Sequence, residues 1–333
     1  LAVAVAGPLL HVVYAEIIAA AVGALVAWVG LSRHLRQIAR QPGTALWQEP
    51  TWREMWRTGN NMYFARLITL LSSPQMLTLL VQRYLGAEAA ALFGFLRSLY
   101  DQITGYLPAN LLFAVIQPKL VASYVGGGGS SEMTRNANLA GKLSLFALMP
   151  LLAIAALSGD FIISLASGGK FVNAGVMFFG LMLTLVPYSQ RLLLETVAMA
   201  AGNSDVCVRA AFTSVPAVAA AYAMMLAGAG LWSVIIGLGL SYLLFNAVVL
   251  LQMKARCGYR GDAQGTLKLA LAALAAYLVT AILGETEPEW VIQVLDALLI
   301  CAVYLFVAWL LKPFTEVERS RLNALLNRRL FIW

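Results

Sequence analysis

Two apolar stretches of the chain each contain an arginine and a carboxylate spaced four residues apart. Arg97 precedes Asp101, and Arg191 precedes Glu195. On a helix this spacing brings the two charges together, so each pair can neutralise itself. An arginine guanidinium can also hold a phosphate or pyrophosphate oxyanion through paired hydrogen bonds. The residue types therefore fit either a structural ion pair or a binding site for an anion.

The arginines in the apolar stretches share helical faces with other polar side chains. Steps of three and four residues place these side chains on one face, and a proline lies nearby in each case. Contact between such polar faces and lipid would be costly, so we expect the segments to line a common water-filled cavity. The prolines would allow the helices to bend. The expected cavity residues are Arg66, Thr69, Ser73, Arg97, Asp101, Tyr188, Arg191 and Glu195.

Plainer roles for the intramembrane charges stay open. Arg66 lies about 7 Å from the inner end of its predicted helix and Arg191 about 12 Å, so either side chain can extend toward the membrane surface. The arginine–carboxylate pairs can be purely structural. Glu16 and Asp296 lie about 9 to 11 Å from the outer ends of their helices, where each can reach water or exchange a coupling cation.

The chain is unusually apolar. Of its 333 residues, 61% are hydrophobic and 12% are charged, and the mean hydropathy is +0.78; a soluble domain carries about twice that share of charge. Several windows are long enough to cross a hydrocarbon core of about 30 Å as helices, and they lack the alternation of barrel strands. The sequence predicts an all-α polytopic membrane protein with about nine transmembrane helices. The windows are residues 9–32, 61–83, 89–117, 143–158, 174–199, 210–229, 231–252, 267–284 and 290–311.

The basic residues predict an orientation. If the first helix exits to the cytoplasm, 18 of the 23 lysines and arginines lie in inner loops and two in outer loops, as the positive-inside rule requires. The C-terminus is then cytoplasmic. The net charge of +7 belongs to these loops, so a nucleic-acid-binding face is not expected. The inner loops are residues 33–60, 118–142, 200–209, 253–268 and 312–333.

Two inner segments have distinctive compositions. Trp52 and Trp56 stand four residues apart beside arginines, as in an amphipathic segment lying on the membrane surface. The glycine-rich segment YVGGGGSSEMTRN, residues 124–136, lacks the Gly-Lys-Ser/Thr ending of a nucleotide-binding loop. We expect it to be a flexible loop.

Metal, cofactor and disulfide chemistry lack support in the sequence. Cys207, Cys257 and Cys301 do not pair plausibly in the predicted topology, so free thiols are expected. His11 and His34 are the two histidines, and there is no Cys/His cluster at ligand spacing. We therefore expect no metal site and no cofactor.

Two longer stretches resemble a known family. VQRYLGAEAAALFGFLRSLYDQITGYLPANLLFAVIQPKL, residues 81–120, resembles the seventh and eighth helices of the polysaccharide (Wzx-like) flippases. These flippases are a branch of the multidrug/oligosaccharidyl-lipid/polysaccharide (MOP) exporter superfamily. FIISLASGGKFVNAGVMFFGLMLTLVPYSQRLLLETVAMAAGNSDV, residues 161–206, resembles the ninth-to-tenth helix hairpin of the same family.

The resemblance implies a transporter of two six-helix lobes from which most of the first lobe is missing. The chain begins at Leu1 without a methionine, which fits a chain truncated at its N-terminus. The implied regions are 1–32, the last helix of the first lobe; 33–60, a cytoplasmic amphipathic connector; 61–252, the six-helix second lobe; 253–311, two extra transmembrane helices; and 312–333, a basic cytoplasmic tail.

The resemblance also implies a function. Such a protein flips a polyprenyl-pyrophosphate-linked oligosaccharide across the bacterial cytoplasmic membrane, with the arginines contacting the pyrophosphate. The candidate partners are that lipid-linked oligosaccharide, membrane lipid, Na⁺ or a proton as coupling ion, and polysaccharide polymerase machinery.

Two other functions stay open. One is a cation-coupled multidrug antiporter of the same superfamily, although two of the deeper carboxylates have arginine partners. The other is a membrane glycosyltransferase or polymerase. The longest outer loop has only about 16 residues, 159–174, which disfavours an enzyme.

Overall fold

The computed structural model describes residues 9–38, 51–111, 129–284 and 290–326. Within these ranges the regular structure is helical. The chain divides into two compact units, Leu1–Glu49 and Pro50–Trp333. The described part of the first unit is helix α1 (Leu9–Ile38), whose described side chains are mostly exposed and apolar, as expected of a helix that crosses lipid.

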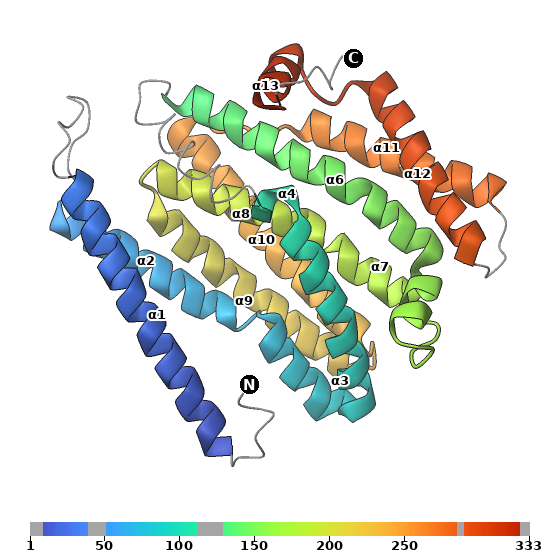
Figure 1. Ribbon diagram of the computed structural model, residues 1–333, viewed down its shortest axis with the longest axis horizontal. Helices are drawn as coiled ribbons and strands as arrows, with labels where there is room; N and C mark the ends of the chain where they lie inside the picture. The colour runs from blue at the N-terminus through green and yellow to red at the C-terminus, as the bar shows by residue number, and fades with distance from the viewer. Residues whose placement is uncertain (1–8, 39–50, 112–128, 285–289, 327–333) are drawn as a thin grey trace. The chain divides into compact units, whose positions relative to one another are not determined.

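The second unit is a bundle of helices connected mostly by short turns (Figure 1). Its helices are α2 (Trp52–Leu70), α3 (Pro74–Tyr106), α4 (Pro108–Leu111), α6 (Gly129–Ala166), α7 (Gly175–Leu183), α8 (Leu185–Ala200), α9 (Ser204–Leu226), α10 (Trp232–Cys257), α11 (Ala263–Leu283), α12 (Trp290–Leu311) and α13 (Glu316–Leu326).

Eight spans among the described residues are long and apolar enough to cross a membrane. The predicted all-α polytopic architecture is confirmed, but nine windows were expected. Two of those windows, 61–83 and 89–117, fall in a single span of 55 residues, Trp52–Tyr106. A straight helix of that length would measure about 80 Å, more than twice the hydrocarbon thickness. The chain breaks it twice. α2 ends at Leu70 and α3 begins at Pro74, within the predicted window 61–83. α3 then turns sharply at Gly86, whose φ of 90° favours glycine (Figure 1).

Proline interrupts the helix that carries the Arg191 face. One window was predicted over residues 174–199, whereas the structure has α7 and α8 meeting at Thr184. Pro187 has no backbone N–H, so the carbonyl four residues earlier loses its helical donor. Near this bend, the carbonyl of Pro187 itself accepts a hydrogen bond from Asn246 Nδ2 of α10 at 2.7 Å. The bend is therefore held by a neighbouring helix.

The glycine-rich segment differs from its prediction. A flexible loop was expected over residues 124–136, but α6 begins at Gly129 and runs for 38 residues; residues 124–128 lie outside the described ranges. Likewise, the predicted inner loop 200–209 is shorter, because α9 begins at Ser204 after a turn with Gly202 at φ 70°. Once a helix starts, each added residue gains a backbone hydrogen bond, so helices extend past the apolar window.

Close packing of the bundle depends on small residues. Gly237 of α10 lies against Ala221 of α9, and Gly180 of α7 lies beneath Trp232, where an added Cβ would be 2.7 Å from the ring. Small residues let membrane helices approach closely, which replaces the hydrophobic driving force that lipid cannot supply. These contacts hold together the helices that carry the polar faces.

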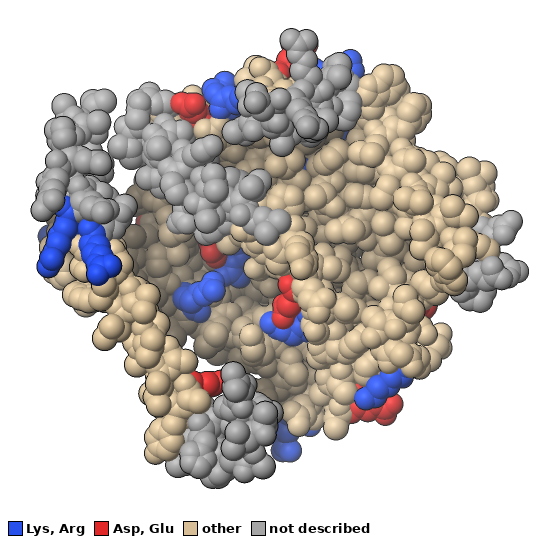
Figure 2. Space-filling view, in the orientation of Figure 1, with Lys and Arg blue, Asp and Glu red and all other residues tan. Residues whose placement is uncertain are grey.

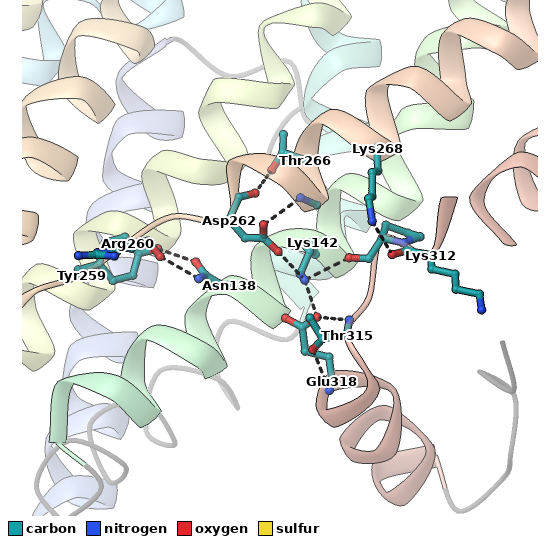
Figure 3. A network of polar contacts seen from close by, with 12 residues as sticks. Asn138, Lys142, Tyr259, Arg260, Asp262, Thr266, Lys268, Lys312, Thr315 and Glu318 are labelled. Carbon is teal, nitrogen blue, oxygen red and sulfur yellow. Dashed lines mark hydrogen bonds and ion pairs between the residues drawn. The ribbon is translucent and has the colours of Figure 1, made fainter. Parts of the chain in front are cut away.

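A buried ion cluster lies at the end of the bundle that the sequence predicts to be cytoplasmic (Figure 3). Lys142 of α6 has 2% of its side chain exposed and forms ion pairs with Asp262, at 2.7 Å, and with Glu318. Its Nζ also donates to the Pro313 carbonyl at 3.3 Å and lies 5.7 Å from the Phe314 ring centroid. One lysine thus joins α6 to the α10–α11 turn and to α13.

This ion cluster brings together three segments that were all predicted as inner loops. Lys142 belongs to 118–142, Asp262 to 253–268 and Glu318 to 312–333, so the three lie on one side of the bundle. Burial raises the pKa of Asp262, but hydrogen bonds from Lys142 and from the Gly265 N–H outweigh it and lower the pKa below its ordinary value.

Lys142→Met is expected to destabilise the protein by about 3 kcal/mol, because it leaves the buried Glu318 and the partly buried Asp262 without their cation. Thermal unfolding of the purified protein measures this change. Lys254→Met, at an exposed lysine of α10, is the control and should change stability by no more than about 0.5 kcal/mol. Equal unfolding temperatures for the two variants would contradict the role of the ion cluster.

Acid should loosen the α10–α11 turn from α6, because Asp262 of this turn pairs with Lys142. Since the folded state lowers the pKa of Asp262 from its ordinary 3.8, the Asp262 contribution to stability is present above that value and is lost as pH falls through the lowered one. Limited proteolysis of the α10–α11 turn across an acid titration tests this. Asp262→Asn should remove part of the pH dependence; an unchanged acid profile in that variant would exclude Asp262 as the responsible group.

Candidate functional site

The second unit contains a cavity of about 470 Å³ lined by α2, the turn after it, α3, α8 and Tyr242 of α10. The structure brings all eight residues of the expected cavity to its walls. Figure 2 shows basic and acidic side chains recessed among uncharged ones in the centre of the drawn face. The predicted residues on the walls are Arg66, Thr69, Ser73, Arg97, Asp101, Tyr188, Arg191 and Glu195.

Arg97 and Asp101 form the first ion pair of the cavity. Arg97 Nε donates to Asp101 Oδ2 at 3.1 Å. The Arg97 side chain is 17% exposed and that of Asp101 is 53% exposed, so the arginine lies deeper than its partner. Arg97 Nη1 is buried without a hydrogen-bond partner among the described residues. The guanidinium therefore keeps donor capacity that the aspartate does not use.

Arg191 and Glu195 form the second ion pair, with Nε donating to Oε1 at 2.8 Å. The guanidinium carbon also lies 4.3 Å from the Phe245 ring centroid and 5.7 Å from that of Tyr242. Cation–π contacts of this kind stabilise an arginine out of water. Arg191 is thus held by a carboxylate and two aromatic rings, and its orientation does not depend on reaching the membrane surface.

Arg66 is the third arginine of the cavity and is exposed to it. Within the described ranges it has no carboxylate within ion-pair distance. Three guanidinium groups against two carboxylates, those of Asp101 and Glu195, leave the cavity with one excess positive charge. An anion is therefore favoured over a cation as the species that enters it.

Sequence reasoning predicted Tyr188 but missed two further tyrosines of the cavity wall, Tyr100 and Tyr242. Tyr100, Tyr188 and Tyr242 line one side, with ring centroids 6.5 Å apart for the first two and 5.4 Å for the last two. The Tyr100 hydroxyl is buried without a hydrogen-bond partner in the described part of the chain. Tyr100 lies three residues after Arg97, so helical spacing could have found it. Tyr242 lies on α10, and no sequence pattern links it to the arginines.

The cysteines form no disulfide: Cys207, Cys257 and Cys301 are free, as expected. Cys207 was expected in a loop but lies in α9. Among the described residues there is no group of three or more histidine, cysteine, aspartate or glutamate side chains placed to hold a metal ion.

The membrane-length helices around a charged, recessed cavity define a polytopic all-α membrane protein. No protein-family model and no curated protein sequence matches the chain. Among solved structures, the chain is similar to "Lipid II flippase MurJ, inward closed conformation", with a TM-score of 0.58 and 14% identity over 75% of this chain. The match covers 51% of that structure, so the chain spans about half its length.

At 14% identity this likeness shows the fold alone: the chain shares the helical fold of that flippase structure over 75% of its length.

Water access to the cavity can be tested with single cysteines in a background where Cys207, Cys257 and Cys301 are replaced by serine. Asp101→Cys should react with a membrane-impermeant thiol reagent, because the Asp101 side chain is 53% exposed in the cavity. Two controls should stay unmodified: Ser189→Cys, at a position 1% exposed, and Leu243→Cys, on an α10 surface that lipid covers. Equal reaction at positions 101 and 243 would mean that the cavity is not selectively wet.

Proposed function

We propose that the protein flips a polyprenyl-pyrophosphate-linked oligosaccharide across the bacterial cytoplasmic membrane during synthesis of cell-surface polysaccharide. The fold supports a flippase, since the solved structure that the chain resembles is that of a lipid II flippase. Orientation with the C-terminus in the cytoplasm rests on the distribution of basic residues. Residues 61–252 then act as one transport lobe and residues 253–311 as two added helices.

The observation that carries the proposal is the excess of arginine in the cavity. Arg66, Arg97 and Arg191 reach it from α2, α3 and α8. A pyrophosphate carries several oxygens that accept hydrogen bonds from planar guanidinium groups, often two at a time. In a cavity with low-dielectric walls this attraction is stronger than in water. The substrate part best matched to the cavity is therefore the pyrophosphate.

The carboxylates have a positioning role in this proposal. Asp101 and Glu195 each bind the Nε side of an arginine, which lowers the cost of burying the guanidinium and fixes its plane. Each guanidinium keeps N–H groups that its carboxylate does not use, and these can donate to phosphoryl oxygens. Arg66, which lacks such a partner, contacts the substrate from α2.

The cavity size selects which part of the substrate enters. About 470 Å³ lies within the range of small-molecule sites, so it admits a pyrophosphate with its first sugar. A polyprenyl chain is longer and apolar, and is left in the surrounding lipid. Flipping then needs only the polar headgroup to pass through a wet path, while the breaks at Gly86 and Thr184 let the walls of the cavity move.

A cation-coupled multidrug antiporter is the alternative. Such a transporter would use free carboxylates to bind a cationic drug or its coupling ion. In this cavity both carboxylates are paired with arginine, at 3.1 Å and 2.8 Å. Ethidium efflux driven by a Na⁺ or proton gradient would be the positive sign of the alternative.

Binding to the purified chain tests the proposal. Arg97→Ala and Arg191→Ala should each weaken binding of a polyprenyl-pyrophosphate oligosaccharide by about tenfold or more, because each loses a charge-assisted hydrogen bond of about 1.5 to 3 kcal/mol. Arg83→Ala, outside the cavity, should bind as the wild type does. Unfolding temperatures establish that the variants remain folded. Unchanged affinity in both cavity variants would refute the proposed role of the arginines.

A further inference from the structure

Asp296 is a buried carboxylate in a membrane span. It lies in α12, six residues after Trp290 and thus about 9 Å along the helix, and is 7% exposed. Asp101 and Glu195 each have an arginine partner. Asp296 has neither an ion pair nor a hydrogen bond with any residue that the structure describes.

An unpaired carboxylate in this position has to be neutralised. A charged aspartate inside a membrane helix costs about 2.5 to 3.5 kcal/mol, which a partner or a proton offsets. The sequence offers no basic residue nearby in the chain: the turn between α11 and α12, residues 285–289, reads Glu-Thr-Glu-Pro-Glu. The neutralising charge therefore has to come from solution.

Oxygen atoms that suit a small cation lie beside Asp296. The Thr280 carbonyl and Asp296 Oδ1 both approach Gly284, since a Cβ added there would lie 2.6 Å from the first and 2.8 Å from the second. The Thr280 carbonyl accepts the Gly284 N–H at 2.7 Å, which leaves its second lone pair. Thr280 itself is fully buried, and its Oγ1 has no hydrogen-bond partner among the described residues. Carboxylate, hydroxyl and carbonyl oxygens are the ligands of hard cations.

No other described charge competes for this place. Asp296 is the one aspartate, glutamate, lysine or arginine of α12, and α11 carries only Lys268, at its other end, where Nζ donates to the Lys312 carbonyl. On α6, Asp160 accepts a hydrogen bond from the Gly175 N–H at 2.7 Å and so caps α7. The glutamates of the turn lie outside the described residues.

We propose that Asp296 reversibly binds a monovalent cation, Na⁺ or a proton, at the end of the α11–α12 hairpin, with Thr280 supplying further oxygen ligands. The site is separate from the arginine cavity, whose lining includes neither residue. It does not depend on the lipid-linked substrate.

The test is carboxyl labelling of the purified, wild-type full chain with dicyclohexylcarbodiimide, which modifies protonated carboxyls in apolar surroundings. Mass spectrometry locates the modified residue. In choline buffer, modification of Asp296 should be high at mildly acidic pH and should fall about tenfold for each pH unit above the midpoint of the labelling curve. No variant is needed for this measurement, so a folding defect cannot obscure it.

Replacing choline by Na⁺ at fixed pH identifies the cation. Several-fold lower modification in Na⁺ supports a sodium site, while a pH-dependent curve that Na⁺ leaves unchanged supports a proton site. Thr280→Val should weaken Na⁺ protection and keep the choline curve, whereas Asp101→Asn should alter neither. Asp296 that stays unmodified at every pH in choline would overturn the proposal, since it would then be permanently ionised. Either result leaves lipid-linked substrate binding to be judged by the arginine variants.

Discussion

A charge placed among apolar helices has to be neutralised or hydrated, and the arrangement of this bundle depends on that constraint. Arg97 and Arg191 meet it with carboxylates one turn away on their own helices, and Arg191 adds two aromatic rings. Lys142 meets it with carboxylates from two distant segments. The guanidinium groups of Arg97 and Arg191 line the cavity, whereas the ammonium group of Lys142 is enclosed by protein.

These two solutions serve different purposes. An ion pair between residues four apart on one helix adds nothing to the joining of helices, so its retention in a cavity fits a binding role. The Lys142 cluster ties α6 to two segments more than a hundred residues further along the chain, and it fixes how the C-terminal helices sit on α6. Its two carboxylates make the attachment dependent on charge, whereas the small-residue contacts of α9 with α10 depend on shape.

The fold and the cavity support the proposed function in complementary ways. Similarity to a flippase structure at 14% identity concerns the path of the backbone, while the excess of guanidinium groups concerns the chemistry of the cargo. A transporter for lipid-linked pyrophosphates needs both: helices that can tilt around breaks such as Gly86 and Thr184, and a wet cavity that favours an anion. The tyrosine wall of Tyr100, Tyr188 and Tyr242 adds an aromatic surface beside the arginines.

The sequence by itself determined the class of protein, because apolar windows and rare charges are local properties of the chain. It also determined which residues share the cavity, since helical spacing and the cost of lipid exposure require polar faces to meet. Spacing along one helix does not show which helices pack against each other, so only the tertiary structure decided the contacts between helices. Tyr242 joins the cavity from α10, and Lys142 pairs with Asp262 and Glu318. These contacts join residues far apart in the sequence, and their partners depend on how whole helices pack.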